Sequence, residues 1–268
     1  MTFQPVVPLG GLAGWSFLER TRARQEAAFQ TSPVVARPAG DFEARIGTIR
    51  TAEALVSDRG LLRVALGAFG LDGDIGNRFF IRKILEDGTT SRTALANRLA
   101  DKRYLAFAEA FGYGDRPGGN VGRPGFGADI AARFRERQFE IAVGQSNPDM
   151  RLVLGLGREL SAIADRPLSN DGRWFAMMAS PPVRAVFERA LQLPSQIGGI
   201  DIDRQLAIFK QRSEVRLGTS DFAAFAAPEG ETRLRRAFLA APDSIGVPAS
   251  VRGSGALALL AASAVRLA

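Results

Sequence analysis

The sequence predicts an all-α protein, a multi-helix bundle with irregular or orthogonal packing and loosely attached terminal segments. Two observations lead to this fold class. Apolar residues recur every three to four positions along most of the chain, as they do on one face of a helix. Almost no segment alternates strictly between apolar and polar residues, as a half-buried strand would. Apolar residues make up 46% of the 268 residues, which is enough for one large core or two small ones.

The first predicted helix covers about residues 12–30 and follows a loose N-terminal stretch. Trp15, Leu18 and Phe29 lie along it at helical spacing. Because only part of this stripe is apolar, we expect the helix to be amphipathic and partly exposed. The segment TSPVVARPAG (31–40) contains two prolines and a glycine and therefore predicts a linker.

The helical pattern becomes regular from Asp41, which we interpret as a helix N-cap. The stretch LLRVALGAFGL (61–71) is apolar around most of its circumference and predicts a buried helix. Segment 112–127 (GYGDRPGGNVGRPGFG) is rich in Gly and Pro and lacks apolar periodicity, so it predicts a second linker.

Helix start signals mark the second half of the chain. Asn147 precedes Pro148, and Ser180 precedes Pro181; proline is well tolerated in the first helical turn because its missing N–H needs no partner there. The predicted organisation is an N-terminal amphipathic segment with its linker (1–40), a first helical subdomain (41–113), a Gly/Pro-rich linker (114–127), a second helical subdomain (128–241) and a flexible or helical tail (242–268).

The two predicted subdomains show an internal similarity. A shift of 122 residues aligns apolar positions of one with apolar positions of the other. Two explanations stay open: a degenerate duplication, which would make the subdomains similar, or the general likeness of any two amphipathic helices. The aligned pairs include Leu55 with Met177, Val64 with Val186, Leu71 with Leu193 and Ile75 with Ile197.

The chain contains no Cys and no His, which excludes thiol nucleophiles, disulfides, imidazole bases and Cys/His zinc sites. Carboxylate chemistry, a Ser–Lys pair or an oxygen-only metal site would survive this exclusion. Glu136 and Glu140 are interpreted as surface ion-pairing residues beside arginines, and Asp201 and Asp203 as acids at a helix start. We therefore predict no enzyme, and no catalytic, cofactor-binding or metal-binding residue.

Two motifs resemble ligand-binding loops superficially. DGDIGN (72–77) begins like a calcium loop, but its twelfth position is Lys83, where a bidentate Glu is required. We interpret it as a turn between helices. Gly155 and Gly157 follow no predicted strand, so they indicate close helix packing instead of a phosphate site.

The net charge of +7 comes mostly from arginine. The arginines are spread along the chain between acids, and no nucleic-acid motif accompanies them, so we predict no nucleic-acid partner. Neither a cleaved signal peptide nor an apolar stretch long enough to span a bilayer is visible.

Several stretches together resemble a known family. The similarity covers about residues 41–240 and consists of packing and capping motifs, not reactive ones. The sequence resembles domain-of-unknown-function family 1217 of bacterial proteins, whose members are often encoded among flagellar genes. The stretches are LLRVALGAFGL (61–71), NRFFIRKILE (77–86), ALANRLADKRY (94–104), EIAVGQSNPDMRL (140–152) and SPPVRAVFERALQL (180–193).

The resemblance implies a non-enzymatic structural or assembly protein of the flagellum that acts by helix–helix contacts. The alternative is a cytoplasmic adaptor or export chaperone of a motility system. Partners would be flagellar or export proteins, and the location cytoplasmic or flagellum-associated, with export needing no cleaved signal. The residues expected to make the contacts are Trp15, Leu18 and Phe29 in the N-terminal helix and Leu257 and Leu260 in the tail.

Overall fold

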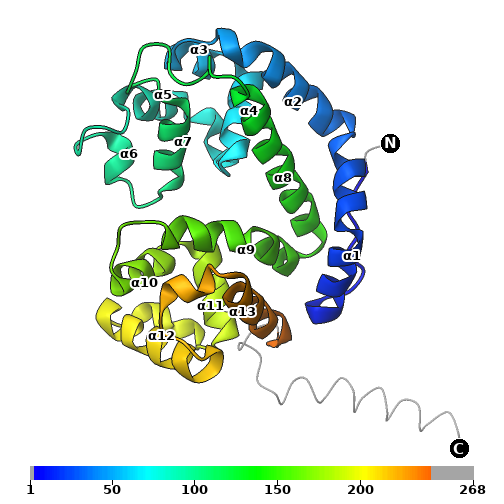
Figure 1. Cartoon of the computed structure of the whole chain (residues 1–268), viewed down its shortest axis with the longest axis vertical. Coiled ribbons are helices and arrows are strands. Elements are labelled where there is room, and N and C mark those ends of the chain that lie inside the picture. Colours follow the sequence, from blue (N-terminus) through cyan, green and yellow to red (C-terminus); the bar gives the residue numbers. More distant parts are fainter. Residues whose placement is uncertain (1–2, 243–268) are drawn as a thin grey trace, which may run out of the picture. The chain divides into compact units, whose positions relative to one another are not determined.

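The computed structural model describes residues 3–242, which contain thirteen α-helices, four short 3-10 helices and no strand (Figure 1). The predicted all-α class is confirmed. Its contacts divide the chain into unit 1, up to Leu154, and unit 2, from Gly155. The α-helices are α1 (Gly11–Gln30), α2 (Pro33–Arg45), α3 (Ala52–Ser57), α4 (Arg59–Ala68), α5 (Arg78–Asp87), α6 (Leu95–Arg98), α7 (Arg103–Phe111), α8 (Phe126–Ser146), α9 (Pro148–Ala164), α10 (Asn170–Met178), α11 (Pro181–Ala190), α12 (Ile202–Leu217) and α13 (Pro228–Ala240). The 3-10 helices are η1 (Ile46–Thr48), η2 (Asp72–Gly76), η3 (Ser195–Gly199) and η4 (Phe222–Phe225).

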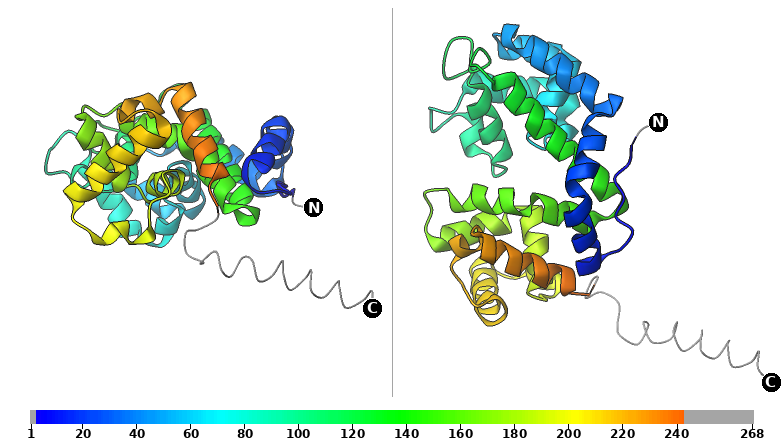
Figure 2. Two further views of the ribbon diagram at one scale, coloured as in Figure 1. Left: turned by 90° about the horizontal axis from the view of Figure 1, so that it is seen from below. Right: turned by 45° about the vertical axis from the view of Figure 1, so that its right-hand side comes forward.

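The segment before α1 runs beside that helix and is held by hydrogen bonds (Figure 2). The Gln25 side chain accepts the N–H of Val6 at 2.7 Å and donates to the Val6 carbonyl at 3.1 Å. Gly14 allows the close approach, because a Cβ there would lie 2.0 Å from the carbonyl oxygen of Leu9. The stretch predicted to be loose is therefore fixed against α1.

Helix α2 replaces most of the linker predicted over residues 31–40. Val35, Ala39 and Phe42 are buried at helical spacing, and α2 packs on α4 and α8 with this face. This apolar stripe overrides the helix-breaking effect of Pro38 inside the helix. Asp41 lies within α2 and pairs with Arg45 at 2.8 Å, so its predicted N-cap role is wrong.

The loop between α7 and α8 is fixed to the end of α7. Asn120 is buried and donates from Nδ2 to the carbonyls of Glu109 and Ala110, while its backbone N–H donates to Phe111. Beyond the loop, α8 packs on α2 and α4, which precede the loop in the chain. The division between the units therefore falls inside α9, and not at the predicted linker 114–127.

The core of unit 2 is an aromatic cluster around Trp174, which is fully buried. Its Nε1 donates to the carbonyl of Ser220 at 2.9 Å, so the indole keeps a polar partner in the core. Four phenylalanine rings lie within 6.4 Å of the Trp174 ring, centroid to centroid. They are Phe187, Phe209, Phe222 and Phe225.

The 122-residue similarity corresponds to a shared local fold. Both bounds of α4 differ from those of α11 by 122 residues. Both helices end with the same pair of hydrogen bonds: Gly70 to Gly67 and Leu71 to Leu66 in one, Gln192 to Arg189 and Leu193 to Glu188 in the other. A 3-10 turn and a further helix follow each. We call α3–α4–η2–α5 repeat 1 and α10–α11–η3–α12 repeat 2. This agreement favours duplication over chance similarity.

Candidate interaction surfaces

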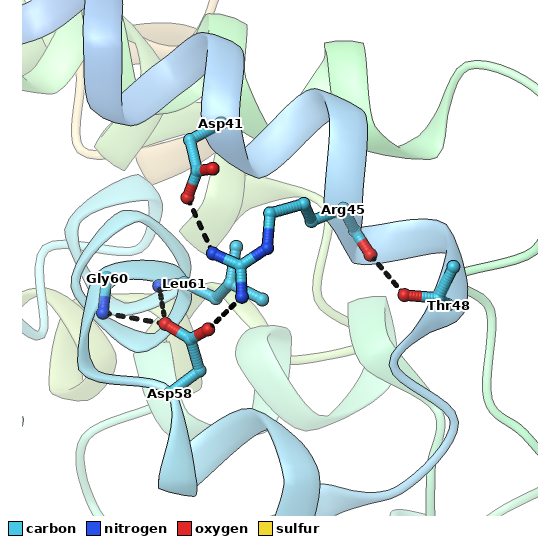
Figure 3. A network of polar contacts seen from close by, with 6 residues as sticks. All are labelled: Asp41, Arg45, Thr48, Asp58, Gly60 and Leu61. Atoms are coloured by element: carbon cyan, nitrogen blue, oxygen red, sulfur yellow. Dashed lines mark hydrogen bonds and ion pairs between the residues drawn. The ribbon is translucent and has the colours of Figure 1, made fainter.

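A polar network fixes the start of α4 (Figure 3). Asp58 accepts the N–H groups of Gly60 at 2.9 Å and Leu61 at 3.1 Å through Oδ1, which makes it the N-cap of α4. Its Oδ2 accepts from the Arg45 guanidinium, which also pairs with Asp41. The Leu61 N–H and then Arg45 lower the pKa of Asp58 below its usual value. The first turns of α4 are held in place as a result.

The next residues of α4 line a cavity of about 350 Å³ between α4 and η2. Arg59 and Arg63 lie one helical turn apart and are both exposed, while Leu66 is buried. Ile75 of η2 forms an apolar wall, and Asp72 lies at the same cavity with its Oδ1 accepting from Gln138. The cavity thus combines two cations with an apolar lining and one acid.

Neither arginine of this cavity is engaged elsewhere. Within residues 3–242, the guanidinium groups of Arg59 and Arg63 form no hydrogen bond or ion pair. Repeat 2 has Pro181 and Ala185 at the corresponding positions and forms the same helix without them. Folding of the repeat therefore does not require these two cations.

An exposed aromatic ring marks helix α5. Phe79 is 76% exposed, and no other aromatic side chain in the described part of the chain is as accessible. The guanidinium of Arg82 lies 5.9 Å from its ring centroid. The adjacent Phe80 instead packs edge-on against Tyr104, with ring centroids 5.3 Å apart. Phe79 thus presents apolar surface to solvent without any partner from its own core.

Comparison with known proteins gives the family. The model of a family described as a protein of unknown function, DUF1217, matches residues 68–230. The chain belongs to the DUF1217 family. A crystal structure of an Agrobacterium tumefaciens protein is similar to this DUF1217 chain, with a TM-score of 0.71 and 20% identity over 88% of this chain and 96% of the other. At that identity the likeness establishes the fold alone. No curated protein sequence matches significantly.

The structure buries two of the residues predicted to contact partners. Leu18 is fully buried, and Phe29 is 7% exposed with its ring packed edge-on against Phe139 at 5.8 Å. Both are core residues of unit 1, because α1 packs on α8. Trp15 is half-buried. The tail residues Leu257 and Leu260 lie outside the described residues.

The structure shows the surroundings of three acidic residues that were considered above as possible ligands or catalytic groups. Asp74 of the DGDIGN segment accepts from Asn77 at 2.8 Å and from the Tyr104 hydroxyl at 2.6 Å, which stabilises the turn expected there. Asp201 is the N-cap of α12, in agreement with its predicted place at a helix start. Glu140 is buried, contrary to the surface position predicted for it. No group of three or more candidate metal ligands occurs within residues 3–242.

No helix in the described range combines the length and the hydropathy that a membrane span requires.

The two surface features of repeat 1 were missed at the level of sequence. Arg59 and Arg63 belong to the arginines that are spread along the chain, and Phe79 has the helical spacing typical of a core residue. The available signal was a pair of arginines spaced by four residues in an otherwise apolar helix. Only the packing of η2 against α4 shows that this pair borders a cavity.

Proposed function

We propose that this protein is a non-enzymatic structural or assembly protein of the bacterial flagellum that acts through helix–helix contacts with partner proteins. The flagellar part of the proposal rests on the family, whose members are often encoded among flagellar genes. The contact part rests on one observation, the exposure of Phe79 on α5.

An exposed phenylalanine on a rigid helix is suited to an interface. Complete burial of such a ring by a partner contributes about 1.5–3 kcal/mol. Aromatic anchors are also enriched among the residues that dominate binding energy. Aligning the N-cap residues Asn77 and Asp201 places Asp203 of repeat 2 at the position of Phe79. The repeat therefore folds without an aromatic residue there, which supports a role in binding.

Complementation of a deletion strain tests the proposal. Phe79→Ala should reduce swimming and the co-purification of flagellar components, while circular dichroism and thermal stability stay unchanged because the ring is exposed. Val215→Ala is the matched control, since Val215 is also 76% exposed but lies on α12 of repeat 2. Normal swimming of the deletion strain would contradict the proposal, and an equal loss with both variants would contradict the assignment to Phe79.

Fractionation separates the two roles within a motility system. A structural component is expected in sheared filaments or basal-body preparations. Retention in the cytoplasm would favour the alternative of an adaptor or export chaperone.

A further inference from the structure

We propose that the α4–η2 cavity binds a carboxylate flanked by an apolar side chain, supplied by an acidic segment of a partner protein. The two exposed guanidinium groups of Arg59 and Arg63 provide forked N–H donors one helical turn apart. A carboxylate accepts two parallel hydrogen bonds from such a donor, so its geometry and charge both match. The Asp58 cap holds the turn that carries these arginines.

The lining of the cavity narrows the ligand class. Leu66 and Ile75 contribute apolar surface beside the cations, which a purely ionic ligand would leave uncovered. A volume of about 350 Å³ lies near the lower end of small-ligand sites, roughly 300–1,000 Å³, and accommodates an acidic side chain with an aliphatic neighbour. Asp72 adds one negative charge at the same cavity. The preference for a carboxylate over a phosphate ion therefore rests on the apolar lining, which an inorganic phosphate would leave uncovered.

A second surface hollow contains an arginine that already has a hydrogen-bond partner within the protein. The trough of about 500 Å³ on α13 is also bordered by two arginines, Arg233 and Arg236. Arg233 donates to the carbonyl of Leu217 at 2.7 Å, and Glu229 borders the same trough. One of its two arginines thus donates to a local partner, whereas neither the guanidinium of Arg59 nor that of Arg63 has a partner within the described residues.

The source of the carboxylate, an acidic segment of a partner protein, rests on the function proposed above. If the protein acts by contacts with other proteins, an acidic segment of a partner is the ligand that the cavity would meet. The preference of the cavity for a carboxylate does not depend on that function, because it follows from its charge and lining. The binding experiment therefore succeeds or fails independently of any swimming assay.

The experiment is a titration of the isotope-labelled full-length chain, followed through the Nε–H signals of its arginines. The probe is acetyl-Leu-Glu-Leu-amide, and the neutral reference is acetyl-Leu-Gln-Leu-amide. We expect saturable shifts of the Arg59 and Arg63 signals with the Glu peptide, with a dissociation constant on the order of millimolar. Binding of the Gln peptide should be about tenfold weaker, because it cannot form charge-assisted hydrogen bonds.

Variants test the residues of the cavity. The double variant Arg59→Gln, Arg63→Gln should lose binding, and Arg63→Gln alone should weaken it while changing only one exposed side chain. Asp72→Asn should tighten binding by about two- to threefold, because it removes a repulsive charge. Arg236→Gln on α13 is the matched control and should bind the peptide as the natural chain does.

Several results would overturn the inference. Equal shifts with the Glu and Gln peptides, or unchanged binding by the double variant, would show that the cavity does not bind a carboxylate through these arginines. Tighter binding of inorganic phosphate than of the Glu peptide would contradict the choice of a carboxylate. Tighter binding of free hexanoate would contradict a partner protein as its source and assign the cavity to a small organic acid.

Discussion

Gln192 occupies a backbone conformation that normally belongs to glycine. It is the one non-glycine residue with a positive φ in the described range, at 52°, and it follows the C-cap of α11. Repeat 1 has Gly70 at the corresponding position, with a φ of 70°. A side chain in the left-handed region costs about 1–2 kcal/mol relative to the right-handed one. Repeat 2 should therefore contain strain that repeat 1 avoids.

Gln192→Gly is expected to raise the free energy of unfolding by about 0.5 kcal/mol. Removal of the left-handed strain stabilises the fold, but glycine returns about 0.5–1 kcal/mol through the entropy of the unfolded chain. The exposed hydrogen bond from Arg216 to the Gln192 amide, at 3.0 Å, is also lost. Gln192→Ala is the matched control, since it loses the same hydrogen bond and keeps the strain, so it should be slightly destabilising.

The reverse change in repeat 1 should have the opposite sign. Gly70→Ala introduces the strain, and its Cβ would lie 2.8 Å from Nη1 of Arg137, which must move. We expect a loss of about 1 kcal/mol, or roughly 2–4 °C in the midpoint of thermal unfolding. Urea denaturation followed by circular dichroism measures all three variants, and the fluorescence of buried Trp174 reports on unit 2. A Gln192→Gly protein no more stable than Gln192→Ala, or a stabilising Gly70→Ala, would refute the reasoning.

Three other predictions concern polar contacts. Asp58→Ala should cost about 1–2 kcal/mol through loss of the α4 cap, and Asp58→Asn less because an acceptor remains. The pKa of Asp58 in the folded protein lies below its unfolded value of about 4, so its ionic contribution to stability is present above that pH and is lost as the pH falls through the folded pKa. Urea titrations at decreasing pH should therefore show the free energies of unfolding of the wild type and Asp58→Asn converging. Gln25→Ala should release the segment held at Val6 and accelerate proteolysis before α1, and an unchanged cleavage rate would contradict the hydrogen-bond argument. Burial, and secondarily Asp74, raises the pKa of Tyr104 to about 12. Ultraviolet titration should therefore show ionisation of this phenol well above the usual value. The contribution of the Tyr104 hydroxyl to stability should be fully present below pH about 10 and should be lost as the pH rises and the phenol ionises.

The fold class and several helix starts follow from sequence because their causes are local. Asn147 caps α9 as its position before Pro148 predicts, with Oδ1 accepting the N–H of Met150 at 3.2 Å. The buried character of α4 is equally visible, since a helix that is apolar around most of its circumference must be surrounded by other elements.

The errors come from tertiary packing. Pro38 and Gly40 indicate a break, yet the apolar stripe of α2 packs on α4 and α8 strongly enough to keep the helix. Phe29 belongs to a helix whose stripe is only partly apolar, and nothing local shows that Phe139 lies against it. Periodicity identifies a face of a helix, but it does not say whether that face meets the core or solvent, which is why the exposure of Phe79 could not be predicted.

The two repeats separate residues needed for folding from residues available for binding. Some positions that pack or turn the chain are alike, among them the buried pair Val64 and Val186 and the left-handed turn that repeat 2 keeps despite a glutamine. Positions on the surface differ, with Arg63 opposite Ala185 and an exposed Phe79 opposite Asp203. An exposed side chain whose counterpart has a different chemistry on the same backbone is not required for that local fold. By this comparison, the partner-binding chemistry of the protein is expected on repeat 1.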